Sequence, residues 1–448
     1  MIPGSTNQLL AAGVGYQISR SVRLRSSASA YFNRTFGAGN QQRWTKSFWM
    51  KRGTIGAQQN FFQAGTSGTV GVIYIPTANT FNINLTTSGA DTLITNQVFR
   101  DTSAWYHVVI AVDTTQATAS NRCLLYVNGI AVTSFASTNY PALNSTPVFN
   151  STGQHSIGLT TAAVSGYFDG YLTEINFIDG QALTPSSFGE TNQVTGVWQP
   201  KKYTGTYGTN GFYLNFSDNS NNTAATIGKD YSGNGNNWTP NNISVTAGVT
   251  YDSMLDVPTQ WADGGNGRGN YCVMNPLRTP GGNGAITQGN LYVITLSGDG
   301  HYSSTIAVTS GKWYAEFTPT FLGAAGLVGL VDVSKVAPSA YPNSTAFGWT
   351  YISTGNRINN NVSVAYGATW AANDVIGVAY DADAGTVTFY KNGVSQGQAY
   401  SGITGDIAFC CYDAASANYA EFAANFGQRP FAFSAPSGFK ALNTLNLP

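Results

Sequence analysis

Short runs in which apolar and polar residues alternate fill two parts of the chain, from about residue 20 to residue 190 and from about residue 285 to the end. Examples are "WYHVVIAVD" and "GYLTEINFID" in the first part, and "GKWYAEFTPT" and "DVIGVAYD" in the second. Gly, Asn, Thr and Pro separate the runs, which is typical of half-buried antiparallel strands joined by turns. The pattern predicts an all-β fold class with two antiparallel β-sandwiches.

Each part contains one strong hairpin signal. Asn128-Gly129 and Asn392-Gly393 each follow an aromatic residue by two positions, Tyr126 in "CLLYVNG" and Tyr390 in "VTFYKNG". An Asn-Gly pair tolerates positive φ at both positions, so it favours a two-residue type I′ turn. We therefore expect the two sandwiches to share one hairpin design.

The stretch between the two parts is denser in Asn, Gly and Tyr, as in "DYSGNGNNWTPNN", which is typical of long loops. At 448 residues the chain exceeds the usual single core, so more than one domain is expected. We divide it into an N-terminal arm (residues 1–20), a first sandwich (21–199), a loop-rich connector packed on the sandwiches (200–284) and a second sandwich (285–448).

Charged residues make up only 9% of the chain, and 21 Lys and Arg balance 21 Asp and Glu. The surface must therefore consist largely of neutral polar residues. This composition gives no electrostatic basis for binding nucleic acid. No run approaches the ~20 apolar residues of a membrane helix, and the start "MIPGSTNQLLAAGVGY" lacks the basic segment of a signal peptide, so we expect neither membrane insertion nor an export signal.

The cysteines are few and scattered, without a C-x-x-C pair. We interpret them as buried small hydrophobic residues and expect neither a disulfide framework nor a zinc site. They are Cys123, Cys272, Cys410 and Cys411.

Longer segments make both halves recognisable. "WYHVVIAVDTTQATASNRCLLYVNGIAV" and "GYFDGYLTEINFIDGQALTPSSFGE" resemble laminin G-like, concanavalin A-like jelly rolls, whereas "GKWYAEF", "FGWTY" and "DVIGVAYDADAGTVTFYKNGVSQG" resemble SPRY domains. The ending "NFGQRPFAFSAPSGFKALNTLNLP" is similar to that of tailed-phage virion proteins that join these two modules. The resemblance implies a jelly roll over residues 21–199 and a SPRY domain over residues 285–448.

We find no constellation of catalytic residues. Some jelly rolls of this shape are glycosidases with acidic residues at alternate strand positions. In "TEINFID" these positions hold Glu174, Asn176 and Ile178, while Asp179 falls on the opposite face, so no acid/base pair forms. His107 in "WYHVVIAVD" is interpreted as a hydrogen-bonded histidine of the sheet. We therefore predict a protein without enzymatic activity.

Aromatic residues in the connector are candidates for ligand binding. Exposed rings can stack on the apolar faces of sugars, but packing of the connector against a sandwich is the favoured role for rings of this kind. Both alternatives stay open for Tyr203, Tyr207, Trp238, Tyr251 and Trp261.

"DYSGNGN" places Asp230, Ser232 and Asn234 at alternate positions, as in the first part of an EF-type calcium loop. The twelfth position is Asn241 instead of Glu, which favours a plain Asx-rich turn. Laminin G-like folds often hold calcium, so the resemblance keeps calcium as the alternative. We expect no other cofactor.

The resemblance favours a non-enzymatic virion component, a tail-fibre or surface-adhesion protein that binds host-surface glycans or neighbouring virion proteins. The alternatives are a purely structural decoration protein of the capsid or tail and, third, a polysaccharide-degrading glycosidase. We expect a location in the virion after assembly in the host cytoplasm. Because virion fibres are commonly trimeric, we also expect a homo-oligomer, a trimer above all.

Overall fold

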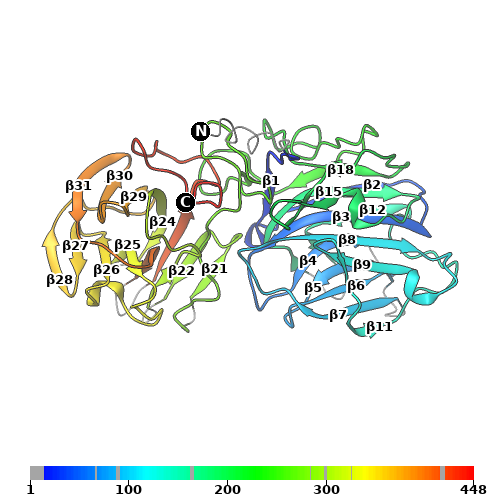
Figure 1. The fold of residues 1–448 in the computed structure, drawn as a ribbon, viewed down its shortest axis with the longest axis horizontal. Coiled ribbons are helices and arrows are strands. Elements are labelled where there is room, and N and C mark those ends of the chain that lie inside the picture. Colours follow the sequence, from blue (N-terminus) through cyan, green and yellow to red (C-terminus); the bar gives the residue numbers. More distant parts are fainter. Residues whose placement is uncertain are drawn as a thin grey trace, which may run out of the picture.

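The computed structural model describes residues 15–65, 68–86, 91–161, 166–282, 284–296, 300–323, 325–413 and 419–448. Residues 1–14 of the predicted N-terminal arm lie outside this set. Two lobes built of strands lie side by side along the long axis of the molecule (Figure 1). The predicted all-β fold class with two antiparallel sandwiches is confirmed.

One sheet of the first sandwich has the order β10-β9-β8-β3-β15-β1-β20, with β18 also paired to β15. Its strands are β1 (Ser21–Leu24), β3 (Arg43–Arg52), β8 (Trp105–Asp113), β9 (Cys123–Val127), β10 (Ile130–Ala131), β15 (Gly170–Asp179), β18 (Phe212–Leu214) and β20 (Ser253–Met254).

The facing sheet has the order β11-β7-β6-β5-β4-β12-β2-β19. Its strands are β2 (Tyr31–Phe36), β4 (Gln59–Ala64), β5 (Gly71–Ile75), β6 (Thr80–Asn84), β7 (Thr92–Val98), β11 (Phe135–Thr138), β12 (Gly153–Ile157) and β19 (Thr239–Asn241). Two small hairpins accompany the sandwich, namely β13 (Leu159–Thr160) with β14 (Gly166–Tyr167), and β16 (Gly189–Thr191) with β17 (Trp198–Pro200).

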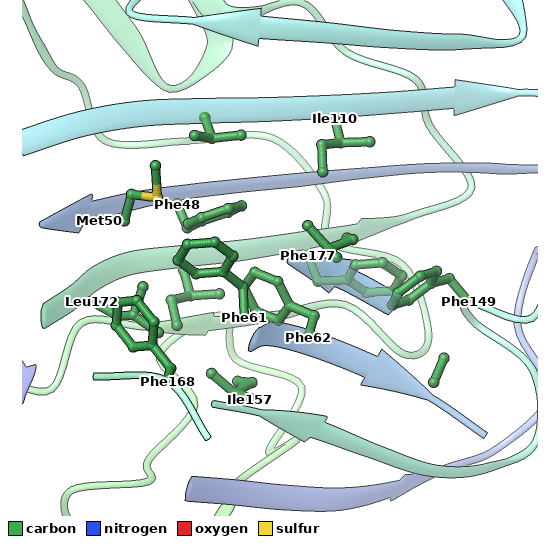
Figure 2. Close-up of a cluster of buried hydrophobic side chains, with 14 of the residues drawn as sticks. Phe48, Met50, Phe61, Phe62, Ile110, Phe149, Ile157, Phe168, Leu172 and Phe177 are labelled. Atoms are coloured by element: carbon green, nitrogen blue, oxygen red, sulfur yellow. The ribbon is translucent and has the colours of Figure 1, made fainter. Parts of the chain in front are cut away.

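Aromatic side chains fill the space between these two sheets. Figure 2 shows Phe48 and Phe177 from one sheet opposite Phe61 and Phe62 from the other. A β-bulge between Asn60 and Phe62 interrupts the alternation of β4, which explains how two consecutive phenylalanines can both join the core. Large rings contribute most of the apolar area that stabilises such a sandwich.

The second sandwich also consists of two antiparallel sheets, with the orders β21-β22-β33-β24-β29-β30-β31 and β23-β32-β25-β26-β27-β28. The strands of the first are β21 (Ala285–Thr287), β22 (Tyr292–Thr295), β24 (Lys312–Leu322), β29 (Ile376–Asp381), β30 (Thr386–Lys391), β31 (Val394–Tyr400) and β33 (Ala420–Asn425). Those of the second are β23 (Tyr302–Ser303), β25 (Gly326–Asp332), β26 (Gly348–Ile352), β27 (Asn356–Asn359), β28 (Val362–Ala365) and β32 (Ile407–Asp413).

The helical segments in the described part of the chain are single 3₁₀ turns. They are η1 (Ser26–Ala28), η2 (Ala119–Asn121), η3 (Pro185–Ser187) and η4 (Pro342–Ser344). Among the described residues, no helix has the length and apolarity needed to span a membrane. All four cysteines are free and buried, as the sequence predicts.

The two Asn-Gly hairpins have the predicted backbone. Asn128 and Gly129 have φ values of 48° and 80°, and Asn392 and Gly393 have values of 48° and 78°. In each case the residues flanking the pair face each other across a two-residue loop. Positive φ at both central positions is the requirement of a type I′ turn, so the shared hairpin design is confirmed.

The asparagine of each turn also binds the strand that precedes the hairpin. The backbone N–H of Asn128 donates to the His107 carbonyl at 2.9 Å, and the His107 N–H donates to Asn128 Oδ1 at 2.8 Å. Asn392 and Val375 make the same reciprocal pair at 2.8 and 2.7 Å. The asparagine therefore fixes the register of three strands as well as forming the turn.

An aromatic ring covers the glycine of each turn. A Cβ atom added to Gly129 would lie 2.6 Å from the Trp198 ring, and one added to Gly393 would lie 2.6 Å from Phe433. Glycine is therefore required twice over, by the positive φ and by the close approach of the ring.

Part of the predicted connector belongs to the sheets of the first sandwich. Strand β18 pairs with β15, β19 pairs with β2, and β20 pairs with β1. These short edge strands satisfy backbone groups that would otherwise be left open at the sheet edges. The division of the chain at residues 20, 199 and 284 stays a prediction.

A buried ion pair joins the connector to the first sandwich. Lys51 Nζ donates to Asp256 Oδ2 at 2.7 Å, to Asn270 Oδ1 at 2.7 Å and to the Tyr271 carbonyl at 2.9 Å. Trp105 Nε1 donates to the other carboxylate oxygen of Asp256 at 2.9 Å. The side chains of Lys51 and Asp256 are both 0% exposed, so each charge depends on these partners for compensation.

Apolar packing across the joint is continuous with the core of the second sandwich. Trp49, Trp105 and Tyr171, which point away from the first core, lie in the same buried cluster as Trp313 and Phe409 of the second sandwich. Strands β21 and β22 lie on the side of the second lobe that faces the first (Figure 1). The two sandwiches therefore share buried surface.

We expect the ring above the Asn-Gly turn to increase the cost of substituting its glycine. In Gly393→Ala, the alanine takes an unfavourable left-handed conformation at a cost of ~1–2 kcal/mol and also displaces Phe433. Gly397→Ala is the matched control, because Gly397 has φ 84° and nothing within 4 Å of its added Cβ. Denaturant unfolding should show Gly393→Ala to be the more destabilising, and equal losses would contradict the role of the ring.

Removing the ammonium at the joint should destabilise the protein strongly. Lys51→Met leaves Asp256 buried without its cation, and breaking a buried pair in this way costs ~3–5 kcal/mol. Lys312→Met is the control, because Lys312 pairs with Asp381 at the surface with 44% of its side chain exposed, and we expect only a small change there. Comparable melting temperatures for the two variants would show that the buried pair does not hold the joint.

Candidate ligand-binding site

Trp198, at the start of β17, is held against the outer face of the first sandwich. Its Nε1 donates to His107 Nδ1 at 2.9 Å, and the two rings stack with centroids 5.9 Å apart. On its other side, His107 stacks on Trp49 at 4.9 Å. Gly189 and Gly129 leave room for the indole, since a Cβ atom on either would lie within 2.6 Å of it.

His107 serves as a fixed support for Trp198. Because Nδ1 accepts the indole hydrogen, the proton of the neutral ring lies on Nε2, 2.9 Å from Ser47 Oγ. Burial lowers the pKa of His107 to about 3, so the ring stays neutral at physiological pH. The interpretation of His107 as a hydrogen-bonded sheet histidine is confirmed.

Trp261, in the connector, holds the segment that precedes β1. Its Nε1 donates to the Ile18 carbonyl at 3.0 Å, while the Ile18 N–H donates to Thr259 Oγ1 at 3.1 Å. The Arg268 guanidinium lies 5.2 Å from the centre of the indole and covers part of it. Residues 15–18 are thereby fixed beside residues 258–261.

Trp198, Trp261 and Tyr16 meet around a pocket of about 480 Å³, which we call the aromatic pocket. All three side chains are half-buried, so part of each ring faces open space. The pocket is lined by Gly15, Tyr16, Gln17, Asn192, Thr195, Val197, Trp198, Gln199, Pro258, Thr259, Gln260 and Trp261. Its volume is within the range of small-ligand sites.

The polar groups of the aromatic pocket are neutral, since no lining residue carries a charge. Gln17 and Gln260 are exposed, and no hydrogen bond to their side-chain amides is recorded within the described structure. Free amides can both donate to and accept from a hydroxyl group. Aromatic faces next to neutral amides can bind an uncharged, hydroxyl-rich ligand such as a sugar.

Of the five aromatic residues proposed from the sequence, only Trp261 lines the aromatic pocket. Trp238 is 2% exposed and packs on Phe36 and Phe212 in the first core. Tyr251 is 4% exposed, and its hydroxyl accepts a hydrogen bond from Asn219. Neither ring lines the aromatic pocket, and both are covered by protein neighbours, so the structure favours packing over the proposed binding role for these two residues.

Tyr203 and Tyr207 are half-buried and lie apart from the lining of the aromatic pocket. Their rings contact each other edge to face at 5.1 Å, and Tyr203 stacks on Phe188 at 5.2 Å. The Tyr207 hydroxyl donates to Asn176 Oδ1 at 3.0 Å. Both rings therefore support the connector on the outer face of the first sandwich, and a binding role for them stays a prediction.

The candidate calcium loop is closed by its own hydrogen bonds. The Asp230 carboxylate accepts from the backbone N–H groups of Tyr213, Ser232 and Asn236 and from Ser232 Oγ, each at 2.8 Å. Asn234 Nδ2 donates to the carbonyls of Gly208 and Gly211. A cation at Asp230 would have to displace these donors, so the geometry favours the Asx-rich turn. Among the described residues, no three His, Cys, Asp or Glu side chains form a group that could hold a metal.

Sequence reasoning missed Tyr16 and Trp198. Tyr16 lay in the predicted arm, and Trp198 lay at the end of the first sandwich. The pocket joins segments near residues 16, 198 and 260, so only the folded chain brings them together. Gly129 and Gly189 admit the Trp198 ring, but they lie far apart in the sequence and form no local signal for it.

Glu174 sits at a β-bulge next to Tyr16. The pairing of β15 with β3 shifts register between Thr173 and Asn176, and Glu174 has a φ of 51°. Its carboxyl group lies 2.7 and 2.8 Å from the Tyr213 hydroxyl and 2.9 Å from that of Tyr16. Burial raises the pKa of Glu174 to about 7, although the hydrogen bonds from both tyrosines oppose the shift.

The neighbours of Glu174 on β15 offer no second carboxylate. Asn176 accepts the Tyr207 hydroxyl hydrogen, and Ile178 lies in a small apolar cluster with Val109 and Phe188. Asp179 accepts hydrogen bonds from Asn40, Asn150 and Asn210. A glycosidase needs an acid and a second carboxylate across the sugar bond, and this strand supplies only the first.

Comparison with known proteins agrees with the two sandwiches. Residues 26–187 match the concanavalin A-like lectin/glucanases superfamily, and residues 326–429 match the SPRY domain. A stretch of 97 residues is 37% identical to an E3 ubiquitin-protein ligase RKP of Arabidopsis thaliana, covering 21% of this chain and 8% of that protein. Another of 144 residues is 29% identical to a probable ATP-dependent RNA helicase ddx1 of Dictyostelium discoideum, covering 32% and 18%. The chain thus spans a small part of both relatives.

Solved structures similar to part of the chain include the SPRY domain of human HERC1, with 19% identity and a TM-score of 0.30 over 34% of this chain and 96% of that one. Stonustoxin has 13% identity and a TM-score of 0.30 over 35% and 27% of the two chains. A human SPRY domain has 17% identity and a TM-score of 0.26 over 31% and 94%. From the domain matches, the chain combines a laminin G-like, concanavalin A-like domain with a SPRY domain, two domain types that typically bind other molecules without catalysis.

Proposed function

We propose that this chain is a non-enzymatic component of a tailed-phage virion, a tail-fibre or surface-adhesion protein that binds neutral host-surface glycans in the aromatic pocket. The observation that carries the glycan part is the meeting of Trp198, Trp261 and Tyr16 around neutral amides. Sugars present apolar C–H faces and many hydroxyl groups, which suit rings and amides of this kind. The virion assignment rests on the resemblance of the C-terminal ending and of the two-domain order.

A second candidate function is contact with neighbouring virion proteins. Strand β28 is an edge strand, and it exposes 60% of Val362 and 42% of Val364. Exposed edges with apolar side chains are suited to pairing with another chain. On this proposal the protein assembles as a homotrimer or docks on another virion subunit, and analytical ultracentrifugation of the purified chain measures the first of these.

A glycan array followed by titration calorimetry tests the aromatic pocket. We expect Gln17→Ala combined with Gln260→Ala to weaken binding of the best glycan at least about tenfold, because hydrogen-bonding amides are lost without disturbing a structural contact. Trp261→Ala should weaken binding further. Gln398→Ala is the control outside the pocket, because Gln398 is an exposed amide on β31 of the second sandwich. Uniform absence of glycan binding, together with tight binding to a capsid or tail subunit, would favour the structural role.

The pH dependence of stability tests whether Glu174 is a buried structural carboxyl group or a catalytic acid. Because its folded pKa of about 7 lies above the ordinary 4.5, its stabilising contribution is full below pH 4.5 and is lost as the pH rises through 7. Glu174→Gln removes this dependence. The free energy of unfolding of the variant, relative to that of the wild type, should therefore rise by up to about 3 kcal/mol from pH 5 to pH 8. Melting curves at both pH values measure the difference.

The glycosidase alternative makes the opposite prediction for the same variant. The wild type would release reducing sugar from a host polysaccharide, and Glu174→Gln would abolish this release without changing the fold. That result would contradict the binding proposal and support the glycosidase. Without such release, the pH-dependent gain in stability identifies Glu174 as a buried structural carboxyl.

A further inference from the structure

A second pocket lies on the outer face of the β24 sheet of the SPRY domain, beneath the segment that follows β33. It has about 320 Å³ of space, and we call it the Arg429 pocket. Three parts of the chain meet there, the connector near residue 248, the sheet itself and the segment after β33. It is lined by Ala247, Gly248, Val249, Glu316, Thr318, Asn373, Val375, Asn425, Arg429, Pro430, Phe431 and Ala432.

Arg429 brings unused hydrogen-bond donors to this pocket. The residue is 3% exposed, and its Nη1 donates to the Val249 carbonyl at 2.7 Å. Among the described residues, the Arg429 side chain makes this one hydrogen bond and no ion pair with a carboxylate. A guanidinium has five N–H donors, so Nε and Nη2 keep theirs for a ligand.

The nearby acidic groups are already occupied. Asp252 accepts from Arg23 at 3.1 Å, from Arg25 at 2.8 and 3.0 Å and from the Ser244 N–H at 2.9 Å. Glu316 accepts from the backbone N–H groups of Ala432 and Phe433 at 2.8 and 3.0 Å. These contacts leave Arg429 near both carboxylates but, within the described residues, without a hydrogen bond to either.

The charges around Arg429 are balanced in number. Arg23 and Arg429 face the carboxylates of Asp252 and Glu316. Burial, and after it the neighbouring Arg23, lowers the pKa of Arg429 to about 9. The side chain is still cationic at neutral pH, and an anion bound to it would accept hydrogens from the donors that Arg429 leaves unused.

We propose that the Arg429 pocket binds the carboxylate of an acidic sugar, such as a uronic acid, with Arg429 as its anchor. A carboxylate matches the fork of guanidinium N–H groups and carries a single negative charge. Glu316 lines the same pocket and would repel a phosphate dianion more strongly than a carboxylate. This inference rests on the proposed glycan-binding function and assigns an acidic sugar to a second site.

The rest of the lining suits the hydroxyl groups of a sugar. No hydrogen bond to the side chains of Thr318 and Asn373 is recorded in the described structure, and Glu316 can accept a hydroxyl hydrogen beside the two backbone donors it already binds. The carboxylate end of a peptide offers one N–H group close to its charge, whereas a uronic acid offers several hydroxyls. The acceptors in the pocket therefore favour the sugar.

Saturation-transfer NMR and titration of the full chain with methyl glucuronide, methyl glucoside and N-acetylglycine test the proposal. We expect the glucuronide to bind at least tenfold more tightly than the other two, and Arg429→Gln to abolish this difference. Arg357→Gln is the matched control, because Arg357 is a half-buried arginine of the same domain, over Tyr400, away from the pocket.

A second variant covers the case in which Arg429→Gln fails to fold. Val375→Trp fills the pocket from the strand side without changing a charge, and it should abolish glucuronide binding while the melting temperature is kept. Equal binding of glucuronide and glucoside, or glucuronide binding that survives Val375→Trp, would overturn the proposal. If N-acetylglycine binds more tightly than the glucuronide, the proposal is overturned and the ligand is a peptide carboxylate instead of an acidic sugar. Neutral glycans titrated into the same samples report separately on the aromatic pocket.

Discussion

The burial of the Lys51 ammonium constrains how the connector, and with it the second sandwich, lies on the first. An ammonium out of water needs acceptors for its hydrogens, and Lys51 finds three in Asp256, Asn270 and Tyr271. These acceptors bracket the segment that supplies Trp261 and residues 258–260 to the aromatic pocket. Cys272 and Met274, which follow at once, enter the buried cluster of the second sandwich. The ion pair thus links the position of the pocket to that of the second domain.

The two Asn-Gly turns show one solution to the same problem in two different domains. In each, the asparagine binds the strand before the hairpin, and a ring from a later segment closes over the glycine. In the first domain that ring is Trp198, whose partly open side lines the aromatic pocket. In the second it is Phe433, whose backbone N–H binds Glu316 in the Arg429 pocket. Both candidate sites therefore lie beside the segment that covers a hairpin turn.

Alternation and turn chemistry were sufficient to predict the long strands. "WYHVVIAVD" is β8 (Trp105–Asp113), and both Asn-Gly turns have the expected backbone, because these signals are local. The positions of strands β18, β19 and β20 were not predicted, since edges of two or three residues inside Asn- and Gly-rich sequence exist only through pairing with a distant strand.

The candidate site was predictable only in part, for the same reason. Trp261 could be proposed from its loop-rich surroundings, but whether a connector ring faces solvent or core depends on tertiary contacts, and Trp238 and Tyr251 turned out to be buried. The bulge that places Glu174 beside Tyr213 breaks the alternation on which the strand prediction relied. Pairing across nearly forty residues, as between Glu174 and Tyr213, leaves no local trace in sequence.

The low charge content has a consequence that composition alone does not reveal. Among the few charged residues, Arg23, Lys51, Asp252, Asp256 and Arg429 are buried around the joint between the sandwiches. Charges used inside the protein are not available at its surface, so the exterior is even more neutral than 9% suggests. A neutral surface presents rings and amides to uncharged sugars without long-range repulsion or attraction. Recognition of an acidic sugar then requires a buried cation with unused donors, and Arg429 has both properties.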